Sequence, residues 1–192
     1  MKLMIASDIH GSALFCRKML EAFDREGAER LLLLGDLLYH GPRNDLPKGY
    51  APKEVIALLN DRRERIFCVR GNCDTEVDQM VLRFPIMADY AVLPLDNGRL
   101  CYATHGHVFN MQSPPPLCPG DLLLQGHTHV PCCEAFGENH FCLNPGSVSI
   151  PKEGSERGYM TLCGASFAWK TLDGRIYMER TFDPALPERS GT

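Results

Sequence analysis

Short apolar runs alternate with helical patterns along the first half of the chain. Three of these runs are continuous, as in strands buried on both faces: residues 3–6, 31–34 and 66–69. Between them, apolar residues at helical spacing predict a helix from Ser12 to about Glu26, closed by Gly27, and a second helix that opens at Pro52. This βαβαβ order predicts parallel strands joined by right-handed crossovers.

From residue 90 onward the pattern changes to short strands separated by turns. Asn97-Gly98 and Asp173-Gly174 are typical hairpin turns, and the strands of this half are expected to be mainly antiparallel. Two mixed β-sheets packed face to face, with helices outside, accommodate both halves. We therefore predict an α/β fold with a single domain over residues 1–182 and a flexible tail over residues 183–192.

Length, charge and cysteine usage exclude several classes of protein. The chain has 192 residues and a net charge of -4, which gives no general attraction to nucleic acid or anionic membranes. No apolar run approaches the ~20 residues that span a bilayer, and Asp8 and His10 interrupt any signal-peptide core, so we expect a cytoplasmic protein. The nine cysteines are odd in number and form no CxxC pair, so a disulfide framework is not expected. Four of them lie in apolar patterns and are predicted to be buried: Cys16, Cys68, Cys101 and Cys163.

Seven polar side chains follow five apolar runs, at the points where the strands are predicted to end. They are Asp8, His10, Asp36, Asn72, His105, His127 and His129. Ligands of α/β sheets collect outside the carboxyl ends of the strands, and Asp36, after four leucines, is expected at the centre. Carboxylate, amide and imidazole donors without an obvious thiolate favour manganese, iron, nickel or zinc with nitrogen and oxygen ligands. The alternative is that these polar residues only terminate strands and bind no metal. Seven metal-ligating residue types in this order argue against that alternative.

These residues belong to short motifs in a fixed order. The motifs are residues 8–11 (DIHG), 35–36 (GD), 40–44 (HGPRN), 70–74 (RGNCD), 104–107 (THGH), 126–129 (GHTH) and 144–149 (NPGSVS). The set, which covers about residues 1–180, resembles the calcineurin-like metallophosphoesterase superfamily, and within it the bacterial phosphodiesterases of the YfcE type. The resemblance implies a four-layer α-β-β-α sandwich. It also implies hydrolysis of small phosphodiesters by attack of a metal-bound hydroxide on phosphorus.

The resemblance further implies which residues serve a centre of two divalent ions. Asp8, His10 and His129 would bind one ion, Asn72, His105 and His127 the other, and Asp36 would bridge them. Mn²⁺ is expected, with Zn²⁺, Ni²⁺, Fe²⁺ or Mg²⁺ as alternatives. The residues expected to take part in catalysis are Asp36, Asn72, Cys73 and His105.

One position departs from the pattern of many superfamily members. They have a histidine after the motif's asparagine and use it to protonate the leaving oxygen, whereas here Cys73 stands in that place, followed by Asp74. The thiol of Cys73 either faces the substrate or packs against the protein. The residues expected to bind substrate are His40, Arg43, Cys73 and His107. A surface ion pair for Arg43 and a supporting role for His107 are the alternatives.

Other functions remain alternatives at this stage. The superfamily includes a retromer subunit that serves as a binding module, so a non-catalytic scaffold is possible, but every ligand position here holds a competent residue. A nuclease would have the same chemistry, yet the chain shows no aromatic-basic interleaving. A phosphomonoesterase is a further alternative. The expected partner is a small phosphodiester, with no nucleic-acid groove and no membrane, and a homo-oligomer is left open.

Overall fold

In the computed structural model, which describes residues 1–182, the buried runs of the first half pair as parallel strands. These strands are β1 (Lys2–Ala6), β2 (Arg30–Leu33) and β3 (Ile66–Cys68). The chain returns to the same sheet with an antiparallel meander of β9 (Gly158–Cys163), β10 (Ser166–Thr171) and β11 (Ile176–Thr181). The sheet therefore has the order β11-β10-β9-β1-β2-β3, with the leucine-rich β2 inside it.

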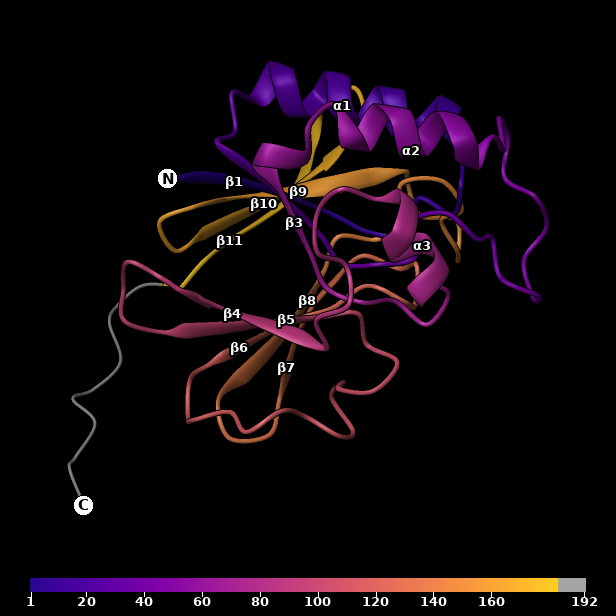
Figure 1. The fold of residues 1–192 in the computed structure, drawn as a ribbon. Coiled ribbons are helices and arrows are strands. Elements are labelled where there is room, and N and C mark those ends of the chain that lie inside the picture. Colours follow the sequence, from indigo (N-terminus) through magenta and orange to yellow (C-terminus); the bar gives the residue numbers. More distant parts are fainter. Residues whose placement is uncertain (183–192) are drawn as a thin grey trace.

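A second sheet packs face to face against the first (Figure 1). Its strands are β4 (Tyr90–Pro94), β5 (Leu100–Thr104), β6 (Leu122–Leu124), β7 (Cys132–Phe136) and β8 (His140–Asn144). The order is β4-β5-β6-β8-β7, in which β5, β6 and β8 are parallel and the outer strands β4 and β7 are antiparallel to their neighbours. Both sheets are mixed, as predicted.

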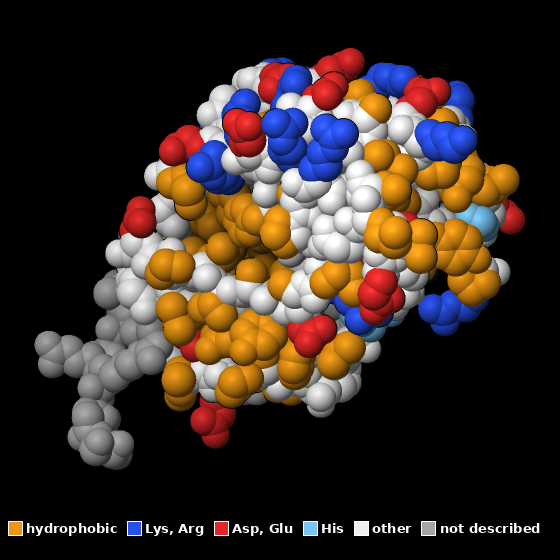
Figure 2. All heavy atoms as spheres, viewed as in Figure 1, with side chains coloured by type: hydrophobic (Ala, Val, Ile, Leu, Met, Phe, Trp, Pro, Cys, Tyr) orange, Lys and Arg blue, Asp and Glu red, His pale blue; other side chains and the backbone are white. Residues whose placement is uncertain are grey.

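Two helices cover the outer face of the first sheet (Figure 1). Helix α1 (Ala13–Glu26) begins after Ser12, whose hydroxyl accepts the Phe15 N–H, and ends at Gly27, which has a φ of 59°. Helix α2 (Pro52–Asn60) has Pro52 in its first turn. A 3₁₀ turn (Arg63–Arg65) precedes β3, and a short helix α3 (Glu76–Val81) follows it. Basic and acidic side chains alternate over the solvent side of these helices (Figure 2).

The outer face of the second sheet has no matching pair of helices among residues 1–182 (Figure 1). Loop residue Phe109 packs there instead, with its ring centroid 5.8 Å from that of Tyr90. The fold is therefore the predicted two-sheet sandwich, but the helical layer implied on this side is replaced by loop.

Two apolar cores explain the leucine run of β2. Leu31 and Leu33 point toward the helices, whereas Leu32 and Leu34 point toward the second sheet. Because successive side chains of a strand alternate, only a strand covered on both faces needs four apolar residues in a row.

The remaining predictions on the fold have mixed outcomes. Cys16, Cys68 and Cys101 are buried and all nine cysteines are free, as expected, but the prediction for Cys163 is wrong: it is exposed at the end of β9, beside the turn to β10. No helix within residues 1–182 is both long and apolar enough to cross a bilayer. The predicted flexible tail, residues 183–192, lies outside the described residues.

Candidate metal centre

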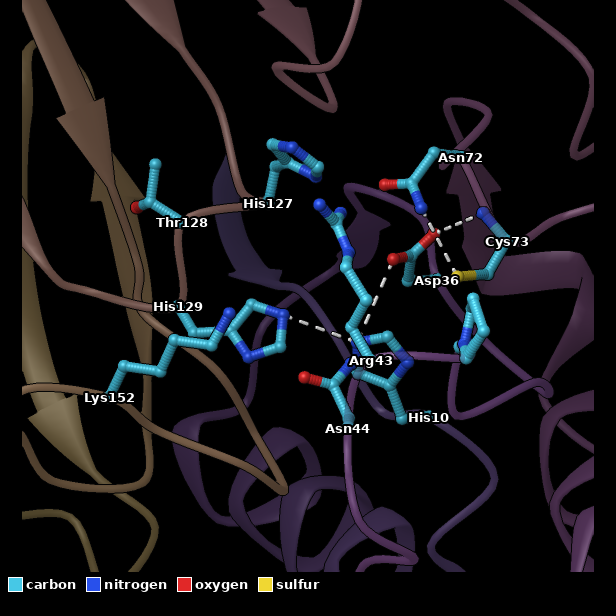
Figure 3. Close-up of a pocket in the computed structure, with 12 residues that line it drawn as sticks. His10, Asp36, Arg43, Asn44, Asn72, Cys73, His127, Thr128, His129 and Lys152 are labelled. Carbon is cyan, nitrogen blue, oxygen red and sulfur yellow. Dashed lines mark hydrogen bonds and ion pairs between the residues drawn. The ribbon is translucent and has the colours of Figure 1, made fainter.

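The seven predicted ligands meet at one edge of the sandwich, where the loops that follow β1, β2, β3, β5 and β6 come together. A cavity of about 430 Å³ opens at this edge (Figure 3). Its lining residues are His10, Asp36, Gly41, Pro42, Arg43, Asn44, Asn72, Cys73, His127, Thr128, His129 and Lys152. The fold thus brings to one edge the predicted ligands, which are far apart in the chain.

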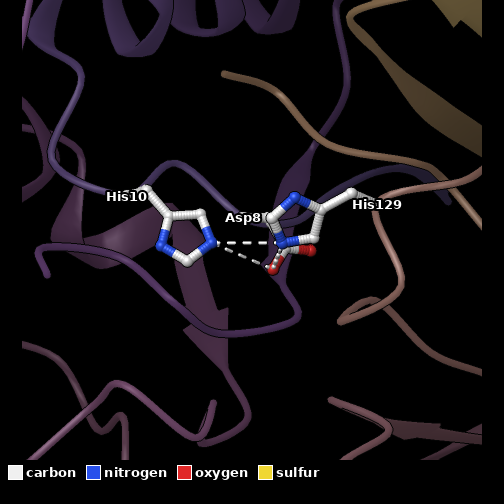
Figure 4. Close-up of side chains that lie close together, drawn as sticks. All are labelled: Asp8, His10 and His129. Atoms are coloured by element: carbon white, nitrogen blue, oxygen red, sulfur yellow. Dashed lines mark hydrogen bonds and ion pairs between the residues drawn. The ribbon is translucent and has the colours of Figure 1, made fainter. Parts of the chain in front are cut away.

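The first group of donor atoms consists of Asp8, His10 and His129, which are all buried (Figure 4). Their donor atoms lie within 4.8 Å of one another. The Nε2 atoms of His10 and His129 are 3.2 Å apart, and Asp8 Oδ1 is 3.1 Å from His129 Nε2. The structure therefore brings together the three residues that were expected to share one ion.

Hydrogen bonds to backbone carbonyls define the tautomers of this group. His10 Nδ1 donates to the carbonyl of Tyr39 and His129 Nδ1 donates to that of Ile150, both at 2.8 Å. In the neutral rings both Nε2 atoms then present lone pairs to each other. Asp8 Oδ1 is buried beside them and has no hydrogen-bond donor within residues 1–182. Three electron-rich atoms in contact repel one another, and a cation between them removes the repulsion, so this group fits a metal ion.

The second group surrounds His105. Its Nδ1 donates to the Leu34 carbonyl at 2.6 Å, which turns Nε2 into the cavity. This Nε2 lies 3.0 Å from Asn72 Oδ1 and 3.2 Å from His127 Nδ1. An amide oxygen and two imidazole nitrogens therefore converge on one point, which again fits a divalent ion.

Asp36 lies between the two groups. Its Oδ2 is 3.6 Å from His10 Nε2 and 3.4 Å from His105 Nε2. Its Oδ1 accepts the backbone N–H of Cys73 at 2.8 Å, which holds the carboxylate in this orientation. One carboxylate thus faces both donor groups, as a bridging ligand must.

Buried carboxylates make the centre attractive to positive charge. Burial alone would raise the pKa of Asp8, but the adjacent imidazoles of His10 and His129 lower it well below its usual range. Burial likewise disfavours a charged His105, yet its hydrogen bond with Asp36 raises the pKa of the imidazole to about 9. Without metal the His105 imidazole therefore takes up a proton, and a metal ion would replace that proton.

Most of the ligands have an uncommon backbone conformation. Five of the seven have φ between 47° and 65°, the left-handed region: Asp8, His10, Asp36, His127 and His129. Neighbouring glycines permit the close approach of the loops that carry them. A Cβ on Gly71 would lie 2.2 Å from Asp36 Oδ1, and one on Gly126 would lie 2.0 Å from the Ser7 hydroxyl oxygen. Larger residues at these two positions would displace the ligands.

Asp74 supports the bridging residue from behind, a role that its sequence position did not indicate. Its Oδ2 accepts the backbone N–H groups of Asp36 and Gly71, both at 2.8 Å, and its Oδ1 accepts that of Leu37 at 2.9 Å. The side chain is buried, which raises its pKa. Asp74 therefore joins the loop that carries Asp36 to the loop that carries Asn72.

The motif at residues 144–149 contains no ligand but holds two ligand loops. The hydroxyls of Ser147 and Ser149 donate to the Asp8 carbonyl at 2.9 and 3.0 Å. The amide of Asn144 donates to the Gly126 carbonyl at 2.8 Å, at the start of the loop that bears His127 and His129. Such contacts orient ligands without touching the ion.

The predicted substrate-binding residues have different environments. Arg43 and Cys73 line the cavity. Burial, followed by the nearby Asp36 carboxylate, raises the pKa of the Cys73 thiol to about 12. His107 is exposed beside the second group, with its ring 5.4 Å from that of His105. The ring of His40 instead packs edge-on against two tyrosines, Tyr39 and Tyr50. The cavity also brings in three residues that the sequence did not single out: Asn44, Thr128 and Lys152.

Comparison with known proteins agrees with this site. A family model for the calcineurin-like phosphoesterase superfamily domain matches residues 1–164. Phosphodiesterase YfcE of Escherichia coli (strain K12) is 52% identical over 159 residues, which are 83% of this chain and 85% of that protein. The solved structure of YfcE, a phosphoesterase from E. coli, superimposes with a TM-score of 0.90 at 46% identity, covering 95% of this chain and 100% of that one. Vps29 of Chaetomium thermophilum shares the fold at a TM-score of 0.57 and 16% identity, covering 94% and 97%. The resemblance and the fold class predicted from the motifs are thus confirmed, and the chain belongs to the calcineurin-like phosphoesterase superfamily.

Proposed function

We propose that this protein hydrolyses small phosphodiesters at a centre that holds two divalent ions. The observation that carries the proposal is the position of Asp36 Oδ2, within 3.6 Å of one donor group and 3.4 Å of the other. The family match and the 52% identity to a phosphodiesterase support the enzyme class, a metal-dependent phosphoric diester hydrolase.

Each ion would be held by side chains from different loops. Asp8, His10 and His129 would hold one, and Asn72, His105 and His127 the other. The nitrogen and oxygen donors suit Mn²⁺, although Zn²⁺ or Ni²⁺ would bind such a set more tightly. When bound, the two ions would polarise the phosphoryl group and supply a nucleophile at neutral pH.

Two residues of the cavity would act on the substrate: one would orient its phosphoryl group, and the other would be a weak proton donor to its leaving group. The guanidinium of Arg43 extends over the centre from one side (Figure 3), where it can donate two hydrogen bonds to phosphoryl oxygens. Cys73 lines the same cavity, and its weakly acidic thiol is a poor proton donor. We infer that esters with good leaving groups are the better substrates.

The alternative functions have less support. A non-catalytic scaffold has no need of six further metal-ligating side chains around the Asp36 carboxylate. A nuclease needs a basic groove, whereas the chain has a net charge of -4 and no aromatic-basic interleaving. The cytoplasmic location and a homo-oligomer stay predictions.

The substitution Asp36→Asn tests the proposal. Removing the bridging charge should lower turnover of bis-p-nitrophenyl phosphate by orders of magnitude and reduce the bound metal, measured by elemental analysis of the purified protein. Asp45→Asn, the same change at an exposed residue of the adjacent loop, is the control and should leave both unchanged. Chelation of the wild type should abolish turnover, and added Mn²⁺ should restore it. Near-normal turnover with two ions retained in Asp36→Asn would refute the bridging role.

A further inference from the structure

The cavity around the metal centre is polar outside its ligands. Apart from the ligands it is lined by Gly41, Pro42, Arg43, Asn44, Cys73, Thr128 and Lys152. None of the lining residues is a phenylalanine, tyrosine or tryptophan, and the three histidines among them belong to the two donor groups, so the described lining offers a nucleobase no other aromatic ring on which to stack. The cavity therefore suits short polar ester groups.

Two cations line this cavity without an acidic partner. Within residues 1–182, neither Arg43 nor Lys152 forms an ion pair with a carboxylate. The carboxylate that lines the cavity is Asp36, which faces the metal ligands. Both cations are therefore available to a bound anion.

The two cations approach the centre from different segments. Arg43 comes from the loop after β2, and its guanidinium reaches over the centre, whereas Lys152 extends alongside His129 (Figure 3). The backbone N–H of Lys152 donates to the His129 carbonyl at 3.2 Å, so the base of this side chain is tied to a ligand. Lys152 thus has a defined place next to the first donor group, apart from Arg43.

From these positions we infer that Lys152 selects phosphodiesters in which one ester group carries a further negative charge, such as a carboxylate or a phosphate. This inference rests on the proposed function and names its substrate class. A phosphodiester has a single negative charge at phosphorus, and the metal ions and Arg43 would already balance that charge. A second unpaired cation at the rim gains a partner only when the retained ester group is anionic, and it repels one that is cationic.

A series of p-nitrophenyl diesters tests the inference, because the leaving group stays constant while the retained group changes its charge. The retained group is 2-carboxyethyl (anionic), ethyl (neutral) or choline (cationic). We expect kcat/KM to fall in that order, by up to about fivefold at each step, the upper end of what an exposed ion pair supplies. The steps should shrink at high ionic strength because salt screens exposed charges.

Substitutions at Lys152 separate this effect from the chemistry. Lys152→Met should bring the three esters to similar kcat/KM values, and Lys152→Glu should reverse their order. Lys18→Met, the same change on the exposed side of α1, is the control and should preserve the order.

Two results would overturn the inference while the proposed function stands: equal turnover of all three esters by the wild type, or an unchanged order in both Lys152 variants. If the metal-loaded wild type hydrolysed none of the diesters, bis-p-nitrophenyl phosphate included, this result would instead refute the proposed function and with it this inference.

Discussion

Replacement of Glu26 by glutamine should cost the protein a large part of its stability, although Glu26 lies away from the cavity. Glu26 is the last residue of α1, and its side chain is 9% exposed. It accepts hydrogen bonds from Lys2 at 2.7 Å and from Lys170 at 2.9 Å. The Tyr159 hydroxyl donates a third at 2.8 Å. Three strands, β1, β9 and β10, are thereby tied to one helix end.

The size of the effect follows from the pKa of this carboxyl group. Burial alone would raise it, but the hydrogen bonds from Lys2, Lys170 and Tyr159 lower the pKa of Glu26 from 4.5 to about 2. Since each tenfold change in a proton equilibrium is about 1.4 kcal/mol, the ionised group contributes about 3 kcal/mol to the free energy of unfolding at neutral pH. Because the folded pKa lies below the unfolded one, this contribution is lost as the pH falls from about 4.5 to about 2.

Urea unfolding followed by tryptophan fluorescence measures the effect, since Trp169 is the single tryptophan and is buried. Glu26→Gln should lower the free energy of unfolding by about 3 kcal/mol at pH 7 and by about 1 kcal/mol at pH 3. Glu54→Gln is the matched control, because Glu54 pairs with Arg17 on the surface with side chains 54% and 49% exposed. It should cost less than about 1 kcal/mol.

A difference below about 1 kcal/mol at pH 7, or one that stays constant down to pH 3, would refute this reasoning. The first result would mean that solvent screens the carboxylate as it does at a surface pair. The second would mean that the loss comes from packing, which does not titrate.

Two further substitutions concern the metal centre. Ser147→Ala removes a hydrogen bond to the Asp8 carbonyl, so it should raise the Mn²⁺ concentration that gives half-maximal activity by about tenfold and change kcat little at saturating Mn²⁺. Ser166→Ala, at the exposed first residue of β10, is its control, and an unchanged Mn²⁺ dependence in Ser147→Ala would contradict the prediction. Cys73→His supplies a stronger general acid, an effect of typically about 10²–10⁴-fold, so kcat/KM should rise more for alkyl than for aryl esters. An equal change for every ester in a series graded by leaving-group pKa would show that proton donation at this position does not limit turnover.

Local signals predicted the helices and strands because they act within a few residues. Ser12 and Gly27 terminate α1 through bonds to its own first and last turns, and the leucines of β2 show burial on both faces directly. Cys163 misled the same reasoning because one apolar residue at a strand end does not reveal whether the neighbouring turn covers it.

Residues that support the site through distant contacts were harder to identify. Asp74 binds two loops through three backbone N–H groups, and Lys152 reaches the cavity through the loop after β8. Neither arrangement leaves a periodic pattern in the sequence, since each depends on segments more than twenty residues away in the chain. An ordered set of motifs places such loops on one edge, but the hydrogen bonds between them become visible only in the fold.

The left-handed backbone of the ligands explains why no single motif is sufficient. In an extended strand, Asp8 and His10 would lie on the same face but would be spaced apart along the chain. With φ values of 60° and 47°, their donor atoms instead lie within 4.8 Å of each other and of the donor atom of His129. Such conformations cost of order 1 kcal/mol or more for each non-glycine residue, and they persist only where neighbouring structure over-determines them. Here the neighbour is the next ligand loop, because the N–H groups of Asp8 and His10 donate to the carbonyls of Gly35 and Asp36 at 3.1 and 2.9 Å. The loop after β2 therefore stabilises the strained backbone of the loop after β1, so the geometry of the first donor group depends on more than one loop.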